Sequence, residues 1–307
     1  MPSTQEFRRR IKSVNNTKQI TKAMEMIASI KMQKSVKTID QARAYIQNAW
    51  NILHAISKKA LPEDHPLVNP KKINKTVAVL ITSDRGLCGS YNAEVIKKFV
   101  QFEKEQCPCE KGEANVCGDY RGSCDVIAIG KVGAQYVNRY KIGKLIAEFK
   151  GFENSVAIED IIPISKMSSG EYLAGHYDRV VLIYSHFASS IKQIPVVQQL
   201  LPITESHIDA QEVWTPIEDK ESAEAKFEPS EQAVIDGILR QILRVQLFGA
   251  VLEANASEHS ARMVAMKNAT DSATDLIDEL TLIYNSVRQS NITTEISEIS
   301  AAAEAMR

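Results

Sequence analysis

The chain has 307 residues, of which 44% are hydrophobic and 24% charged, values typical of a soluble globular protein with room for about two domains. The longest apolar runs, at 77–81 and 180–184, are far shorter than the roughly 18 residues that a membrane-spanning helix needs. The arginines near the N-terminus lead into a polar stretch and not into the apolar core of a secretory signal. We therefore expect a cytoplasmic chain without a signal or transit segment.

Charge is distributed unevenly along the chain. Residues 1–59 contain twelve Lys/Arg against three Asp/Glu, a net charge of +9, so the remainder of the chain carries −10. A basic segment of this kind fits a nucleic acid, a lipid surface or an acidic partner helix. The residue pattern favours the partner helix.

The first 59 residues have the pattern of a single long helix. From residue 39 onward apolar residues recur at steps of three and four, which places them on one face. The same steps occur earlier with a shift in phase, at Phe7, Ile11, Val14, Ile20, Met24 and Ile27. There is no Gly in this segment and its one Pro is Pro2. We expect a helix of about 55 residues, about 80 Å long.

The C-terminal segment repeats this pattern over a greater length. Glu228, Pro229 and Ser230 resemble a helix start, and no Pro follows. The predicted inward positions after that start keep the three-four spacing: Ile238, Ile242, Val245, Gly249, Leu252, Ala256, His259, Met263, Met266, Thr270, Ala273, Ile277, Leu280, Tyr284 and Val287. A helix of about 75 residues would be about 110 Å long, more than a domain of this size can bury.

Small residues allow another helix to approach the C-terminal helix closely; they include Gly249, Ala250, Ala254, Ala256, Ser257, Ser260, Ala261, Ala265, Ala269 and Ala273. The basic N-terminal helix is the obvious partner. The sequence therefore predicts an intramolecular antiparallel coiled coil, with an intermolecular coiled coil between two copies as the alternative.

The middle of the chain has short apolar runs separated by turn residues, which is typical of an α/β, Rossmann-like domain with a mostly parallel sheet. We expect strands at 76–83, 125–130 and 179–185 and helices at 93–106, 131–140 and 158–175. Segment 194–203 should be an edge strand because Pro195 and Pro202 cannot donate hydrogen bonds. The predicted organisation is a shaft of 1–60 and 228–307, an α/β domain at 72–206 with a cysteine-containing insertion at about 106–124, and a hinge at 207–227.

The segment SDRGLCGS at 83–90 follows the first strand, where α/β proteins often bind a phosphate. It matches neither the dinucleotide fingerprint nor the P-loop. We interpret its glycines as permitting a tight turn into the next helix. Cys88 could be a nucleophile only with a base and an orienting group, and the six histidines show no triad order, so a small buried thiol is the favoured interpretation.

Four further cysteines lie close together, at Cys107, Cys109, Cys117 and Cys124. They could hold one tetrahedral zinc ion or form a regulatory disulfide, although the spacing lacks the C-x2-C pairs of common zinc sites. In a reducing cytoplasm, unpaired thiols are the simplest alternative. The sequence predicts no catalytic residue and no cofactor.

Several polar residues of the C-terminal helix have two interpretations. Arg262, Gln289, Thr293 and Glu295 either form a solvated face or contact another protein, since two helices have too little bulk to bury them. His259 lies on the apolar face and is interpreted as a hydrogen-bonded core histidine. Met263 and Met266 are interpreted as core packing.

Five segments resemble signature stretches of the gamma subunits of F-type ATP synthases: ITKAMEMIASIKMQK at 20–34, SDRGLCGSYN at 83–92, IPVVQQLLPI at 194–203, SEHSARMVAMKNATDSATDLI at 257–277 and YNSVRQSNITTEISEI at 284–299. They occur in order and cover nearly the whole chain. The resemblance implies a non-catalytic central-stalk rotor that couples ion flow through a membrane c-ring to ATP synthesis or hydrolysis in the beta subunits.

The resemblance also implies partners. The coiled coil would stand within three alpha and three beta subunits, and the α/β domain would lie beside the epsilon subunit and the c-ring, peripheral to the cytoplasmic face of a bacterial membrane, with no nucleic acid and no direct membrane insertion. In the family, the residues that correspond to Arg262, Gln289, Thr293 and Glu295 contact loops of the beta subunit. The residue that corresponds to Met24 lies near an acidic loop of the beta subunit. The acidic stretch at 205–228 corresponds to the foot that meets the c-ring and epsilon.

The chain departs from the family pattern in two places. The tail at 301–306 has no glycines, and the four-cysteine segment matches no family pattern. Two other functions are compatible with single features: a cytosolic α/β enzyme with a helical dimerisation arm, for which Cys88 would be the candidate residue, and a basic coiled-coil scaffold that binds nucleic acid through residues 8–37.

Overall fold

The computed structural model describes residues 4–60, 65–69, 73–106, 124–153, 156–203 and 231–306. Two long helices begin and end the chain: α1 spans Thr4–Ala60 and α6 spans Glu231–Ala305. Their 57 and 75 residues agree with the lengths predicted from the three-four spacing. The predicted helix start at 228–230 and the predicted hinge at 207–227 lie outside the described residues.

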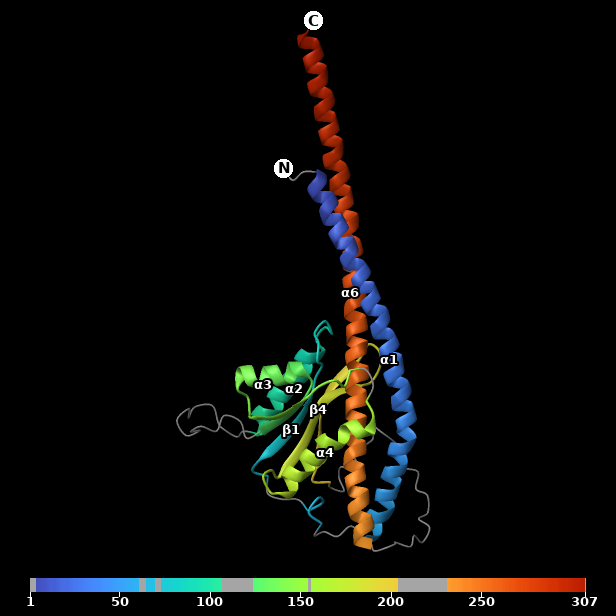
Figure 1. Cartoon of the computed structure of the whole chain (residues 1–307), viewed down its shortest axis with the longest axis vertical. Coiled ribbons are helices and arrows are strands. Elements are labelled where there is room, and N and C mark those ends of the chain that lie inside the picture. The colour runs from blue at the N-terminus through green and yellow to red at the C-terminus, as the bar shows by residue number, and fades with distance from the viewer. Residues whose placement is uncertain are drawn as a thin grey trace, which may run out of the picture. The chain divides into compact units, whose positions relative to one another are not determined.

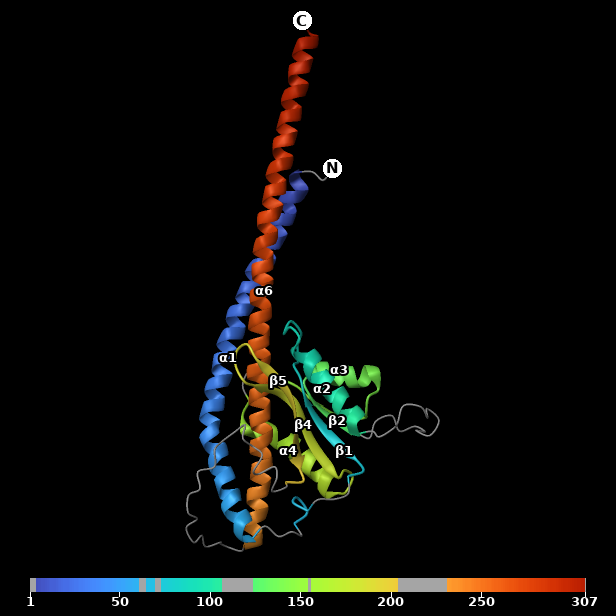
Figure 2. The same cartoon turned by 180° about the vertical axis from the view of Figure 1, so that it is seen from behind.

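Two compact units make up the chain, and each long helix contributes to both. The helical unit comprises Met1–Ser29 and Arg262–Arg307, and the α/β unit comprises Ile30–Ala261. In the helical unit, α1 and α6 are joined by a hydrogen bond between the hydroxyls of Thr21 and Thr270, 2.8 Å apart. In the α/β unit the two helices lie side by side in both views (Figures 1 and 2).

A five-stranded sheet forms the centre of the α/β unit, with strand order β3-β2-β1-β4-β5. The strands are β1 Thr76–Ile81, β2 Cys124–Ile129, β3 Leu145–Phe149, β4 Arg179–Phe187 and β5 Gln193–Leu201. The first four pair in parallel and β5 pairs antiparallel to β4 at the edge, which confirms the edge strand predicted from Pro195. The sequence prediction missed β3, a short strand that pairs with β2 at the other edge of the described sheet.

Helices cover both faces of the sheet. On one face lie α2, Tyr91–Gln106, and α3, Lys131–Tyr140; on the other lie α4, Ile158–Leu173, and the first part of α6 (Figures 1 and 2). Residues of β1 alternate between the faces, as a period of two requires: Ala78 and Leu80 join the cluster under α2 and α3, and Val79 joins the cluster with α4 and α6.

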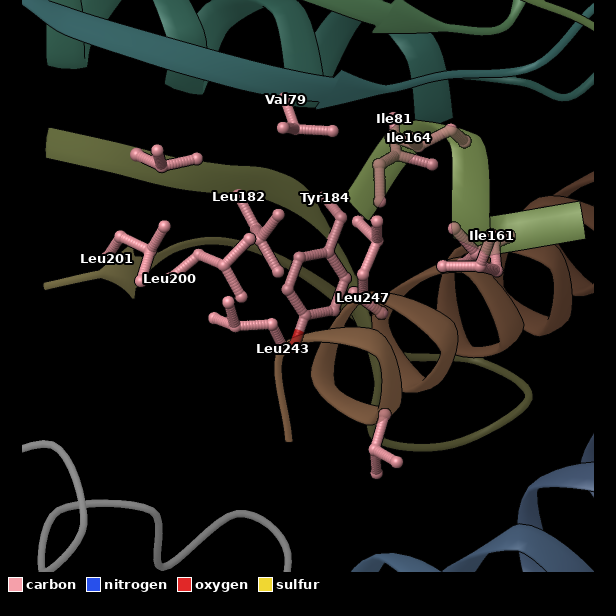
Figure 3. Packing of buried hydrophobic residues seen from close by; sticks show 14 of the residues in the cluster. Val79, Ile81, Ile161, Ile164, Leu182, Tyr184, Leu200, Leu201, Leu243 and Leu247 are labelled. Carbon is pink, nitrogen blue, oxygen red and sulfur yellow. The ribbon is translucent and has the colours of Figure 1, made fainter. Parts of the chain in front are cut away.

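The second cluster attaches α6 to the sheet. Figure 3 shows Leu182 and Tyr184 of β4 pointing toward Leu243 and Leu247 of α6. All four side chains are almost completely buried. Burial of a Leu side chain contributes about 1.5–3 kcal/mol to the free energy of unfolding. The N-terminal part of α6 therefore belongs to the core of the α/β unit.

Candidate functional site

The five predicted partner-contact residues all belong to the helical unit. Met24 lies on α1 and is half-buried, as is Arg262 at the first α6 position of that unit. The remaining three, Gln289, Thr293 and Glu295, are exposed on α6. A helix turns about 100° per residue, so Gln289 and Thr293 share one face while Glu295 points to another. Their contacts with a partner stay a prediction.

The inward face of α1 differs from the predicted one between residues 20 and 28. Ile20 and Ile27 were predicted to face inward, but they are 60% and 55% exposed. Thr21 and Ala28 face inward instead: Thr21 bonds to Thr270, and Ala28 is 1% exposed. The prediction was wrong because it placed the largest apolar residues inside, whereas small side chains bring two helices close together.

Consequently α1 displays apolar side chains at its surface, on a helix that also carries lysines. Ile20, Met26 and Ile27 are all exposed, and the same stretch carries Lys18 and Lys22. Lys22 also bonds to the Glu25 carboxylate at 3.0 Å. Exposed apolar residues of this kind are compatible with a surface that another protein covers. At about 100° per residue, Lys18 and Lys22 lie on the opposite side of α1 from Ile20 and Ile27.

The last part of α6 is exposed on every side. All residues from Arg288 to Met306 are exposed, and Ile292, Ile296 and Ile299 repeat at steps of four and three along one stripe. A helix of about 19 residues with no packed neighbour is marginal in water. A partner that packs on this stripe would account for both its apolar character and its length.

The β1–α2 turn has a structural role. The Asp84 carboxylate accepts hydrogen bonds from Lys131 N, at 3.0 Å, and Gly151 N, at 2.8 Å. It therefore places a negative charge at the N-terminal end of α3, where the helix dipole favours one. Gly89 has φ 60°, a conformation that suits glycine, as expected for a tight turn.

Cys88 is a buried thiol inside this turn, as predicted. It is 2% exposed, and Asn92 Nδ2 donates to its sulfur at 3.1 Å. The same amide group donates to Ser83 Oγ at 2.7 Å, and Ser83 Oγ donates to the Arg85 carbonyl at 2.6 Å. This network closes the turn around the sulfur and does not supply the base that a nucleophile needs.

Only one member of the four-cysteine set is described. Cys107, Cys109 and Cys117 lie outside the described residues. Cys124 is the first residue of β2, where it is completely buried, and burial raises the pKa of its thiol to about 12. Because metal ligation and disulfide exchange both require the thiolate, this position is unfavourable for either, and the role of the set stays a prediction.

A groove of about 850 Å³ runs along α2 and α3. Its apolar surface includes Ile96, Val100 and Tyr136, and Lys97 and Lys104 lie at its rim. The groove runs along the outer surface of the two helices and not in the crevice at the carboxyl ends of the strands, where α/β domains bind nucleotides.

None of the described helices has an apolar stretch that could cross a bilayer. His259 is 1% exposed, and its Nε2 lies 3.0 Å from the Glu153 carbonyl, which confirms the predicted core histidine. Met266 is also buried and Met263 is half-buried. The fold therefore defines a class of protein: an α/β domain combined with a pair of long terminal helices, the second of which ends in an exposed stretch.

Comparisons with known proteins agree with this class. The family model described as ATP synthase matches residues 3–306. The ATP synthase gamma chain of Roseiflexus castenholzii is 37% identical over 308 residues, covering 100% of this chain and 99% of the relative. The chain belongs to the ATP synthase gamma chain family.

Solved structures have the same fold. A chain of the Tetrahymena thermophila mitochondrial ATP synthase, from a structure of its central stalk and c-ring, matches with a TM-score of 0.58 at 22% identity, over 81% of this chain and 99% of that one. A chain from the rotor of the Euglena gracilis mitochondrial ATP synthase matches with a TM-score of 0.60 at 16% identity, over 94% and 98%. The alternative of a cytosolic enzyme with a helical dimerisation arm is not supported.

Proposed function

We propose that this chain is the central rotor of an F-type ATP synthase, a subunit without catalytic activity of its own. The observation that carries the proposal is the exposed end of α6 at 288–306, whose isoleucine stripe lacks a packed neighbour among the described residues. Family membership and the likeness to rotor and central-stalk chains support it.

The partners follow from the two kinds of surface. The helical unit would contact the alpha and beta subunits, through the basic and apolar surface of α1 and through Met24, Arg262, Gln289, Thr293 and Glu295. The α/β unit would lie beside the epsilon subunit and the c-ring, at the cytoplasmic face of a bacterial membrane and without entering it. The exposed isoleucines of α1 favour a protein partner over a nucleic acid.

The mechanism uses the asymmetry of the shaft. Two helices with different side chains present a different face to each surrounding beta subunit. Each face binds the open and closed states of a beta subunit with different affinity, so rotation shifts the populations of those states in turn. Nucleotide chemistry stays in the beta subunits, and the chain transmits force.

The proposal can be tested by purification and by an activity measurement. Gentle purification of a tagged chain from its native source should co-purify alpha, beta and epsilon subunits. The pure chain alone should not hydrolyse ATP, and the assembled complex should. Robust hydrolysis by the pure chain, or purification without these subunits, would overturn the proposal.

A further inference from the structure

One stretch of α6 is buried on every side. All ten residues from Val251 to Ser260 are buried. Polar residues are frequent among them: Glu253, Asn255, Ser257, Glu258, His259 and Ser260. Burying polar groups is costly unless they are hydrogen-bonded. The stretch 253–260, called the clamp segment below, therefore differs from the middle of α6, which buries one face, and from its last part, which is exposed on every side.

One face of the clamp segment bonds to the end of β4. The Glu253 carboxylate lies 2.7 Å from His186 Nδ1, and the two side chains are only 4% and 24% exposed. One turn later, Ser257 Oγ donates to the Ser185 carbonyl at 3.0 Å. A third bond from the same face, donated by Ser260 Oγ, reaches the Ser190 carbonyl in the β4–β5 turn.

Another face of the clamp segment bonds to the turn that follows β3. Asn255 Nδ2 donates to the Phe152 carbonyl at 2.6 Å. His259 Nε2 lies 3.0 Å from the Glu153 carbonyl, and because a carbonyl only accepts, Nε2 carries the proton. The same turn is attached to Asp84 through Gly151 N, so it is fixed to the β1–α2 turn as well.

The two faces point in nearly opposite directions. At about 100° per residue, residues 253, 257 and 260 cluster within about 60° of one another. Residues 255 and 259 lie about 150° away from them. A helix that is held on one face by aliphatic packing can roll or shift by one turn at modest cost, because apolar contacts are non-directional. Directional bonds on two opposed faces prevent both movements.

We propose that the clamp segment fixes the rotational position of α6 in the α/β domain, so that torque passes between them without slip. This inference rests on the proposed rotor function. The clamp segment ends two residues before Arg262, where the helical unit begins along α6. Its residues act as positioning residues: each net hydrogen bond contributes only about 0.5–1.5 kcal/mol, but together they specify a single register.

The test compares ion pumping with ATP hydrolysis in the assembled complex. The double variant Ser257→Ala/His259→Leu removes one bond from each face. Its matched control, Ser257→Ala/His259→Gln, keeps a side-chain N–H donor at residue 259. A second control, Ser168→Ala, removes a buried hydroxyl whose bonds, to Ile164 O and Ser165 O, stay within α4. We expect the ratio of ATP-driven pumping to hydrolysis to fall at least about twofold in the double variant, to recover with Gln, and to be unchanged in Ser168→Ala.

An unchanged ratio in the double variant would overturn the clamp. An equal fall of the ratio in the Gln control or in Ser168→Ala would also overturn it, because it would indicate general destabilisation. A loss of pumping in proportion to hydrolysis leaves the ratio unchanged and has the same meaning. If the double variant does not assemble, His259→Leu against His259→Gln decides by the same ratio. Failure of the proposed function itself is distinguishable, because the wild-type chain would then support no ATP-driven pumping at all.

Discussion

Two leucines of α6 allow a direct comparison between packing within the chain and contact with a partner. Leu247 is 0% exposed and packs against Tyr184 of β4, whereas Leu282 is 73% exposed in the helical unit (Figure 3 labels Leu247 and Tyr184). Leu247→Ala removes buried atoms and leaves a cavity, which costs about 2–5 kcal/mol. For a domain of this size, that loss should lower the melting temperature by about 5–15 °C. Leu282→Ala makes the same deletion in the same helix and should leave the melting temperature of the isolated chain unchanged.

Thermal unfolding followed by circular dichroism measures both variants, and hydrogen exchange in β4 locates the effect. Leu282→Ala should instead weaken assembly with alpha and beta subunits. A higher concentration of the variant chain should then be needed to restore ATP hydrolysis by the complex. Equal melting temperatures for the two variants would refute the division of α6 into a core part and a partner part.

Three further outcomes are expected. Met24→Lys should reduce ATP-driven pumping more than hydrolysis in the complex, because a new cation beside an acidic beta loop adds an ion pair that must break at each step; equal loss of both, or of neither, would contradict the predicted contact. Arg262→Ala and Glu295→Ala should leave the chain folded, with at most about 1 kcal/mol lost for a partly exposed charge such as that of Arg262, but should slow turnover; unchanged rates would indicate a solvated face. The hydrogen bond to Glu253 raises the pKa of His186, so the pair stabilises the fold fully below the unfolded pKa of about 6.5 and this contribution is lost as pH rises through the raised pKa. The stability difference between wild type and His186→Gln should therefore shrink as pH rises above about 6.5 and through the raised pKa, and a constant difference would show that the pair is not the cause.

Hydrophobic spacing predicted most of the fold because each long helix buries one face for much of its length. In the helical unit the predicted inward positions Met266, Thr270 and Ala273 are buried, and their neighbours at 271 and 272 are exposed. The strands of the α/β domain were found for a similar reason: runs such as 76–81 are buried on both faces and read as continuous apolar segments.

Hydrophobic spacing failed in two places: where apolar residues are exposed, and where polar residues are buried. Ile20 and Ile27 are exposed, and a periodic pattern cannot distinguish residues that pack within the chain from residues available to another protein. The clamp segment was missed except for His259, because Asn255 and Ser257 bond to backbone carbonyls of distant turns, which no local pattern displays. Its signal was the density of polar residues in an uninterrupted helix.

The candidate partner contacts stay a prediction. Arg262, Gln289, Thr293 and Glu295 were identified by resemblance, and all four lie in the helical unit, where Arg262 is half-buried and the other three are exposed. Asp84 was not singled out within the SDRG segment, because its two backbone partners, Lys131 N and Gly151 N, come from other parts of the sequence.

Observation of rotation tests the central claim most directly. A complex of this chain with the alpha and beta subunits of the same organism would be fixed to a surface, with a bead attached through a biotin acceptor peptide inserted after Lys141, in the exposed turn after α3. On addition of ATP the bead should turn continuously in one direction, and it should stop when ATP is removed. A complex that hydrolyses ATP at its full rate while a firmly attached bead shows only undirected fluctuation would contradict the role of this chain as the rotor.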